Sequence, residues 1–134
     1  FDEIVEVTKM MEKNQMVEFR KGNRQPVPEH VAKYSFYNEK KANCLFIAPK
    51  IHEGTVEDCF DYSCNKEPFI VKKQLIKFHI VPLTLEQFLK IFLVCTKTET
   101  PSKIWMQILT DLHKINEKDE QLWMASIAKY VERL

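Results

Sequence analysis

The chain has 134 residues, of which 45% are hydrophobic and 29% are charged, and its formal net charge is +1. These values are typical of a globular chain long enough to bury a core, and they exclude a wholly disordered or low-complexity protein. Only two glycines occur, Gly22 and Gly54, which argues against the glycine-rich loops that bind nucleotide phosphates.

The first predicted strand covers residues 1–8, which are rich in Ile, Val and Thr and contain no breaker. Residues 9–27 are polar and contain glycine and proline, so we expect a long loop or a loosely formed hairpin there. Pro28 suits the first turn of a helix, and apolar residues on one helical face extend this helix to about Asn38.

Residues 43–48 form a short continuous apolar run closed by a proline, which predicts a strand buried on both faces. A short helix is predicted over residues 55–62, and residues 64–74 resemble a loop. Residues 76–81 alternate between apolar and polar side chains and stop at Pro82, which predicts a third strand.

The clearest local signal is the pair Thr84 and Gln87, which has the spacing of a capping box at the start of an amphipathic helix. Pro101 begins a further helix, whose apolar residues keep helical spacing as far as Ile115, and a last helix follows over residues 122–134. The order of elements predicts an α/β fold in which helices flank a mixed sheet, with a C-terminal helical pair.

Four cysteines occur, and no pair has the spacing of a zinc-binding knuckle: Cys44, Cys59, Cys64 and Cys95. No secretory apolar region precedes them, so we expect free thiols and a reducing compartment, the cytoplasm. No apolar stretch approaches the roughly 20 residues of a membrane span, so we expect no membrane partner.

Charge is unevenly distributed along the chain. Residues 1–8 carry three acids and no base, whereas residues 9–50 carry nine Lys and Arg residues against four acids. An acidic strand beside a basic segment suits a metal and a phosphate, but solvated charged faces produce similar blocks. The pattern alone therefore leaves both interpretations open.

The first strand contains the candidate site. Alternation places Glu6 and Thr8 on one face of the strand, and we expect Val5 and Val7 to anchor the other face in a core. A carboxylate in an apolar strand needs a metal, a base or hydrogen bonds to compensate for its burial. Glu6 therefore needs an explanation, unless this is an edge strand from which Glu6 faces water.

The other polar residues carry weaker signals. Asp2 and Glu3 lie at the start of the strand and require no explanation of their own. Taken alone, His30 resembles a solvated or capped histidine near a helix start, while His52 and His113 belong to no recognisable constellation. Spacing alone assembles no Ser/His/Asp or Cys/His catalytic set.

The chain contains, in this order, IVEVT, a polar stretch with Gln15, QPVPEHVAKY, CLFIAPKIHEGTVEDCF and IKFHIVPLTLEQFLKIF. This order and spacing resemble the catalytic domain of AlwI-type type II restriction endonucleases, which are related to the FokI cleavage domain and belong to the PD-(D/E)XK nuclease superfamily. The resemblance covers residues 1–95 and implies a restriction-endonuclease-like catalytic domain that is truncated at its N-terminus. Residues 96–134 would form a C-terminal helical extension.

The resemblance implies a type IIS-like enzyme that hydrolyses DNA phosphodiester bonds with a divalent metal, usually Mg²⁺. Glu6 matches the (D/E) position and would bind the metal together with an upstream Asp. Thr8 matches the third position, where the superfamily more often has lysine, so the group that orients the attacking water stays open. His30 matches the histidine of the P-V-x-x-H segment and would activate water or contact the scissile phosphate.

The resemblance also implies double-stranded DNA as a partner, with sequence-independent phosphate contacts from the basic residues around the strand. These residues are Lys9, Lys13, Arg20, Lys21, Arg24 and Lys33. A homodimer or heterodimer would cut both strands, and a separate N-terminal portion would recognise the target. We expect the chain alone to be inactive, because the upstream Asp and the recognition portion lie outside it.

Two other functions remain open. The chain could be a non-enzymatic α/β protein-interaction module, or a different metal-dependent hydrolase on the same sheet plan. The two tryptophans, Trp105 and Trp123, could supply an interface, but we expect them to pack the C-terminal helices against each other or against the sheet.

Overall fold

The computed structural model describes the backbone of residues 1–134 and the side chains of all of them except Lys13. A parallel sheet lies at its centre, with the strand order β1-β2-β5. These strands are β1 (Asp2–Val7), β2 (Ala42–Ala48) and β5 (Ile80–Thr84). A separate antiparallel hairpin joins β3 (Phe69–Val71) to β4 (Gln74–Ile76).

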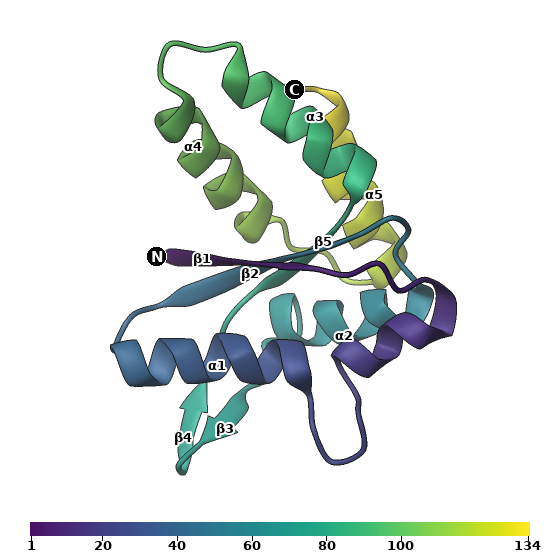
Figure 1. Cartoon of the computed structure of the whole chain (residues 1–134), viewed down its shortest axis with the longest axis vertical. Helices are drawn as coiled ribbons and strands as arrows, with labels where there is room; N and C mark the ends of the chain where they lie inside the picture. The colour runs from purple at the N-terminus through teal and green to yellow at the C-terminus, as the bar shows by residue number, and fades with distance from the viewer.

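Helices cover both faces of the parallel sheet (Figure 1), which confirms the predicted α/β fold. The 3-10 helix η1 (Glu12–Glu18) follows β1, and α1 (Pro26–Asn38) and α2 (Glu53–Ser63) lie on one face. On the other face lie α3 (Leu85–Thr96), α4 (Pro101–Lys114) and α5 (Glu120–Glu132). None of the helices in the described chain is both long enough and apolar enough to cross a bilayer.

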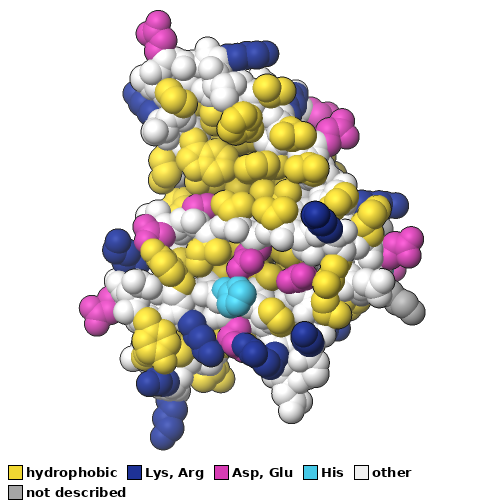
Figure 2. Space-filling view, viewed as in Figure 1, with side chains coloured by type: hydrophobic (Ala, Val, Ile, Leu, Met, Phe, Trp, Pro, Cys, Tyr) yellow, Lys and Arg dark blue, Asp and Glu magenta, His cyan; other side chains and the backbone are white. Residues whose placement is uncertain are grey.

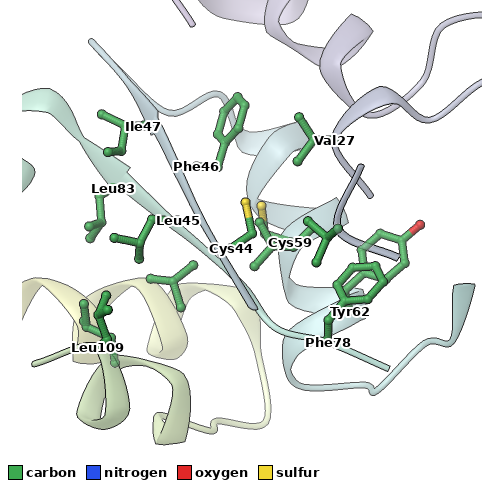
Figure 3. Packing of buried hydrophobic residues seen from close by; sticks show 14 of the residues in the cluster. Val27, Cys44, Leu45, Phe46, Ile47, Cys59, Tyr62, Phe78, Leu83 and Leu109 are labelled. Atoms are coloured by element: carbon green, nitrogen blue, oxygen red, sulfur yellow. The ribbon is translucent and has the colours of Figure 1, made fainter. Parts of the chain in front are cut away.

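The central strand β2 organises the core. All seven of its residues are buried, as the continuous apolar run predicts. Its side chains alternate between the two faces: Cys44 and Phe46 point towards Cys59 and α2, whereas Leu45 and Ile47 point towards the C-terminal helices (Figure 3). The central strand β2 pairs in parallel with β1 on one side and with β5 on the other. Because both faces of β2 are buried, its position in the core determines where the two neighbouring strands lie.

The C-terminal helices share this core. Trp123 is fully buried and meets the ring of Phe60 on α2 edge to face, with 5.7 Å between ring centroids. Trp105 packs against Phe88 of α3 at 6.2 Å. Both tryptophans therefore pack the helices, as expected. The division of the chain at residue 95 stays a prediction, although buried side chains from both parts form one cluster.

Two predicted boundaries are wrong. The third strand of the sheet covers Ile80–Thr84 and runs through Pro82, whereas the sequence pattern predicts residues 76–81. Pro82 is tolerated because β5 lies at the edge of the sheet and pairs only with β2. Residues 64–74 are predicted to be a loop, but they contain most of the β3–β4 hairpin. Its turn residues, Lys72 and Lys73, lack the Asn-Gly pair that usually indicates such a turn.

The expectation that Val5 and Val7 anchor a core is also wrong. Val5 is 44% exposed and Val7 is 68% exposed. The alternation of β1 is as predicted, but β1 is the other edge strand of the sheet. Helix α3 packs on β2 and β5 and helix α4 packs on β5, and the second half of β1 remains uncovered on this face.

Tyr62 gives the fold a testable dependence on alkaline pH. Its ring stacks on Phe78 at 5.2 Å, and burial raises the pKa of Tyr62 to about 12. The phenol of an unfolded chain has a pKa near 10. The fold therefore gains stability from neutral Tyr62 below about pH 10 and loses it as the pH rises towards 12, because only the unfolded chain ionises in this interval.

We expect the wild-type chain to lose about 2 kcal/mol of unfolding free energy relative to Tyr62→Phe between pH 10 and pH 12. Urea unfolding of both proteins at the two pH values measures this difference. Tyr37→Phe is the control, because the Tyr37 ring is 60% exposed. Parallel stability curves for wild type and Tyr62→Phe would contradict the prediction.

Candidate functional site

The structure brings Glu6 and His30 together. Glu6 lies in the second half of β1, opposite Phe46 of β2, and its side chain is about one-quarter exposed. His30 Nδ1 donates a hydrogen bond to Glu6 Oε1 at 2.8 Å. The contact joins residues that are 24 positions apart and that both lie in the predicted site.

The local structure of α1 explains the position of His30. Proline occupies the first turn of α1, where its missing N–H costs no helical hydrogen bond. The buried face of the helix consists of Val27, Pro28, Val31 and Ala32. His30 lies beside this face, and its exposed ring spans the distance between α1 and the edge strand β1.

Thr8 is nearly buried directly after β1, where its N–H still donates to the Ile47 carbonyl at 3.0 Å. Its hydroxyl donates to Glu18 Oε1 at 3.3 Å and accepts from the Met10 N–H at 3.1 Å. The hydroxyl of this predicted site residue therefore contacts a second carboxylate, that of Glu18. Glu18 carries no signal in the sequence, because its contact with Thr8 is formed through the 3-10 helix η1.

Gln15 fixes the segment that follows β1. Its side chain is fully buried, and its Nε2 donates to the carbonyls of Met10 at 3.1 Å and Lys50 at 2.8 Å. Its Oε1 accepts from the His52 N–H at 2.9 Å. The bonds with Lys50 and His52 hold η1 against the loop after β2, and the bond to Met10 fixes the segment after β1, so Gln15 has a structural role.

The predicted phosphate contacts fall into two groups. Arg20 forms an ion pair with Asp58, and Arg24 and Lys33 contact Glu29 at 2.8 Å and 3.3 Å. Burial raises the pKa of Asp58, although the Arg20 guanidinium opposes this shift.

The remaining predicted phosphate contacts have no acidic partner. Among the side chains that the structure describes, Lys9 and Lys21 are exposed and form no ion pair with an acid. The predicted contact at Lys13 lies outside the described side chains.

A buried pair that the sequence did not indicate joins Glu3 to His113. His113 Nε2 donates to Glu3 Oε1 at 2.7 Å, and both side chains are less than 10% exposed. The His113 carbonyl also accepts from His79 Nδ1 at 2.6 Å. The expectations that Glu3 needs no explanation and that His113 belongs to no constellation are therefore wrong. This pair ties α4 to β1 on the face opposite Glu6.

Glu6 has the chemistry of a magnesium ligand. Magnesium is usually held by one or two carboxylates together with water and substrate phosphate. Only Oε1 of Glu6 is hydrogen-bonded to a described side chain, which leaves Oε2 available. Across the described residues there is no group of three or more His, Cys, Asp or Glu side chains that could hold a metal. The residues present therefore fit part of a magnesium site.

Comparison with known proteins places these residues in context. The AlwI restriction endonuclease family model matches residues 1–91. The fold is similar to the crystal structure of the small subunit of the heterodimeric restriction endonuclease R.BspD6I, with a TM-score of 0.66 and 18% identity. The alignment covers 95% of this chain and 61% of that subunit. A search of curated proteins found no match.

Proposed function

The chain belongs to the AlwI restriction endonuclease family, and from this premise we propose that it is the catalytic part of a type II, type IIS-like restriction endonuclease. The proposed reaction is metal-dependent hydrolysis of DNA phosphodiester bonds. The observation that carries the proposal is the hydrogen bond between His30 and Glu6, because it joins the strand carboxylate to the histidine of the P-V-x-x-H segment.

We assign Glu6 the role of metal ligand. Its partly exposed carboxylate has one oxygen oriented by His30 and one oxygen available for Mg²⁺. The chemistry that magnesium supplies when bound is activation of water and stabilisation of negative charge on the phosphate. The family resemblance implies an upstream Asp as the further ligand, and no group of three or more potential ligands occurs among the described residues, so we expect the chain alone to be inactive.

His30 and Thr8 act beside this carboxylate. His30 can hold Glu6 in one orientation, or it can accept a proton from water or contact the phosphate directly. At Thr8 a hydroxyl stands where the superfamily more often has a charged lysine, and this hydroxyl is hydrogen-bonded to Glu18. We propose that Thr8 orients neighbouring side chains but does not neutralise negative charge on the phosphate.

Double-stranded DNA is the proposed partner of the basic residues near β1. Lys9 and Lys21 are exposed and need not leave an acidic partner to contact a phosphate, whereas Arg20, Arg24 and Lys33 would have to exchange partners. Lys13 remains a predicted contact. Such contacts to phosphate position a protein on DNA without reading its sequence.

We further propose a second subunit and a cytoplasmic location. The structurally similar protein is described as a subunit of a heterodimeric enzyme, and a homodimer or heterodimer is the arrangement that would cut both strands. All four cysteines are free, and three of them are buried, which supports a reducing compartment.

The alternative is a non-enzymatic protein-interaction module. Figure 2 shows a band of hydrophobic side chains across the upper part of the molecule, over α3 and α4. Helix α3 exposes four large apolar side chains, each between 44% and 54% exposed: Leu85, Leu89, Phe92 and Leu93. Such an apolar surface is unusual on an isolated monomer. Unlike the proposed nuclease, this module would have no metal-dependent activity.

Metal removal tests the proposal. The full-length product of the gene, incubated with supercoiled plasmid DNA, is expected to cleave it with Mg²⁺, to stop in EDTA and to resume when Mg²⁺ is restored. The 134-residue chain alone is expected to leave the plasmid intact. Cleavage that persists in EDTA, or a full-length protein that never cleaves in Mg²⁺, would refute the proposed reaction.

A further inference from the structure

The β3–β4 hairpin carries a concentration of positive charge that the proposed site does not use. Residues 66–77 contain four lysines and a single acid, Glu67. Lys41 lies beside them at the start of β2. We name these lysines the basic hairpin: Lys41, Lys66, Lys72, Lys73 and Lys77. Among the described side chains, none of them forms an ion pair.

The backbone of the hairpin is unfavourable for lysine. The turn residues Lys72 and Lys73 have φ angles of 46° and 69°, and Lys66 has a φ angle of 57°. Left-handed backbone favours Gly and Asn, and a two-residue turn with two positive φ angles is typically Asn-Gly. Lysine at both turn positions is therefore unusual, and it places two positive charges at the tip of the hairpin.

The hairpin shares one side of the molecule with the predicted phosphate contacts. Figure 1 shows the hairpin projecting below α1, and the loop between η1 and α1, which contains Lys21, projects in the same direction below the N-terminal end of that helix. Helix α1 has 13 residues and is therefore about 20 Å long. Exposed His30 lies in the N-terminal half of α1, and basic side chains gather along the lower end of the molecule in Figure 2.

Two features of the hairpin make its lysines accessible to an anionic partner. Lys72 Nζ lies 5.5 Å from the ring centroid of Tyr37, which holds the ammonium over the exposed end of α1. At the base of the hairpin, Lys41, Lys66 and Lys77 line a pocket of about 180 Å³. The other residues that line it are aromatic, and none is acidic.

We propose that the basic hairpin is a second contact to the sugar-phosphate backbone of duplex DNA, separate from the basic segment after β1. Unpaired lysines on a projecting turn reach phosphates as point charges and require no base sequence. Two basic projections on the same side of α1, the helix that carries His30, would hold the duplex beside this helix. The inference rests on the proposed function, because DNA is the polyanion that such an enzyme acts on.

A double substitution tests the hairpin without damaging its fold. Lys72→Asn with Lys73→Gly removes both charges and installs the residues that the turn prefers, so its melting temperature is expected to equal or exceed that of wild type. Lys97→Gln with Lys103→Gln is the matched control, because these exposed lysines flank the α3–α4 connection at the opposite end of the molecule (Figure 1). Lys72→Arg with Lys73→Arg retains the charge.

The measurement is fluorescence anisotropy of a labelled duplex of mixed sequence, titrated with the chain in EDTA over a salt series. The hairpin variant is expected to bind roughly tenfold more weakly at low salt, and the slope of log affinity against log salt is expected to fall by about 2. The control and the arginine variant should keep the wild-type affinity and slope.

Two outcomes separate the inference from the proposed function. If wild type binds DNA with a salt-dependent affinity and the hairpin variant binds equally well, the hairpin contact is wrong while the proposed function stands. If wild type itself shows no salt-dependent DNA binding, the hairpin inference is overturned, whereas the proposed function is decided separately by plasmid cleavage with the full-length protein.

Discussion

Replacing Glu6 by glutamine is expected to lower the rate of magnesium-dependent DNA cleavage by the full-length protein by more than about 100-fold, beyond the loss typical of outer partners of a metal ligand. Glutamine has the shape of glutamate, and its amide oxygen can still accept the hydrogen bond from His30. The substitution therefore removes the negative charge that Mg²⁺ requires while preserving the local structure. Plasmid cleavage at several magnesium concentrations measures the effect.

The matched control for Glu6 is Glu39→Gln. Glu39 is an exposed acid at the end of α1, the helix that carries His30, and it should retain the wild-type cleavage rate. Melting temperatures of both variants show whether the fold is intact. A Glu6→Gln protein that cleaves within a few-fold of wild type would remove Glu6 from the metal site, whatever the control does.

His30 distinguishes two roles within the same assay. If His30 orients Glu6, His30→Gln should retain most of the activity, because the glutamine amide can still donate a hydrogen bond, whereas His30→Ala should lose about 10- to 100-fold. If His30 transfers a proton, both variants should lose activity to the same extent, because an amide is not a general base.

Local rules predicted the elements that local interactions determine. The capping box at Thr84 and Gln87 forms as predicted, with hydrogen bonds of 2.9 Å and 3.1 Å. The continuous apolar run predicted as a buried strand forms β2, the central strand of the sheet. By contrast, the alternation of side chains along β1 shows which residues share a face of the strand. It does not show which face the helices cover, because this depends on where α3 and α4 end. Val5 and Val7 are exposed for this reason.

The candidate site was predictable only where its residues belong to local sequence motifs. Glu6 and His30 carried motif signals, and their contact was found where the resemblance placed both residues. Glu18 and the pair of Glu3 with His113 carried none, since these contacts join segments brought together only by η1 and α4. Long-range contacts between ordinary polar residues have no local pattern, whether they lie in the site or in the core.

Replacing Trp123 by alanine is expected to lower the unfolding free energy of the whole chain by about 3–5 kcal/mol, which is a large fraction of the about 5–15 kcal/mol of a typical domain. Trp123 is fully buried against Phe60, so its removal leaves a cavity between α5 and α2. Its indole N–H has no hydrogen-bond partner among the described groups, so the loss is one of packing. Urea unfolding followed by circular dichroism measures it.

Leu122→Ala is the control, because Leu122 is the neighbouring residue on α5 and is 52% exposed, so its truncation should change stability by less than about 0.5 kcal/mol. If residues 96–134 share the core of residues 1–95, Trp123→Ala shifts a single transition that both parts follow. If the helical extension folds independently, a second transition remains at its wild-type position, and the continuous buried cluster does not act as one cooperative core. The Trp123 variant thus determines whether the division at residue 95 is a physical boundary or marks only the extent of the family resemblance.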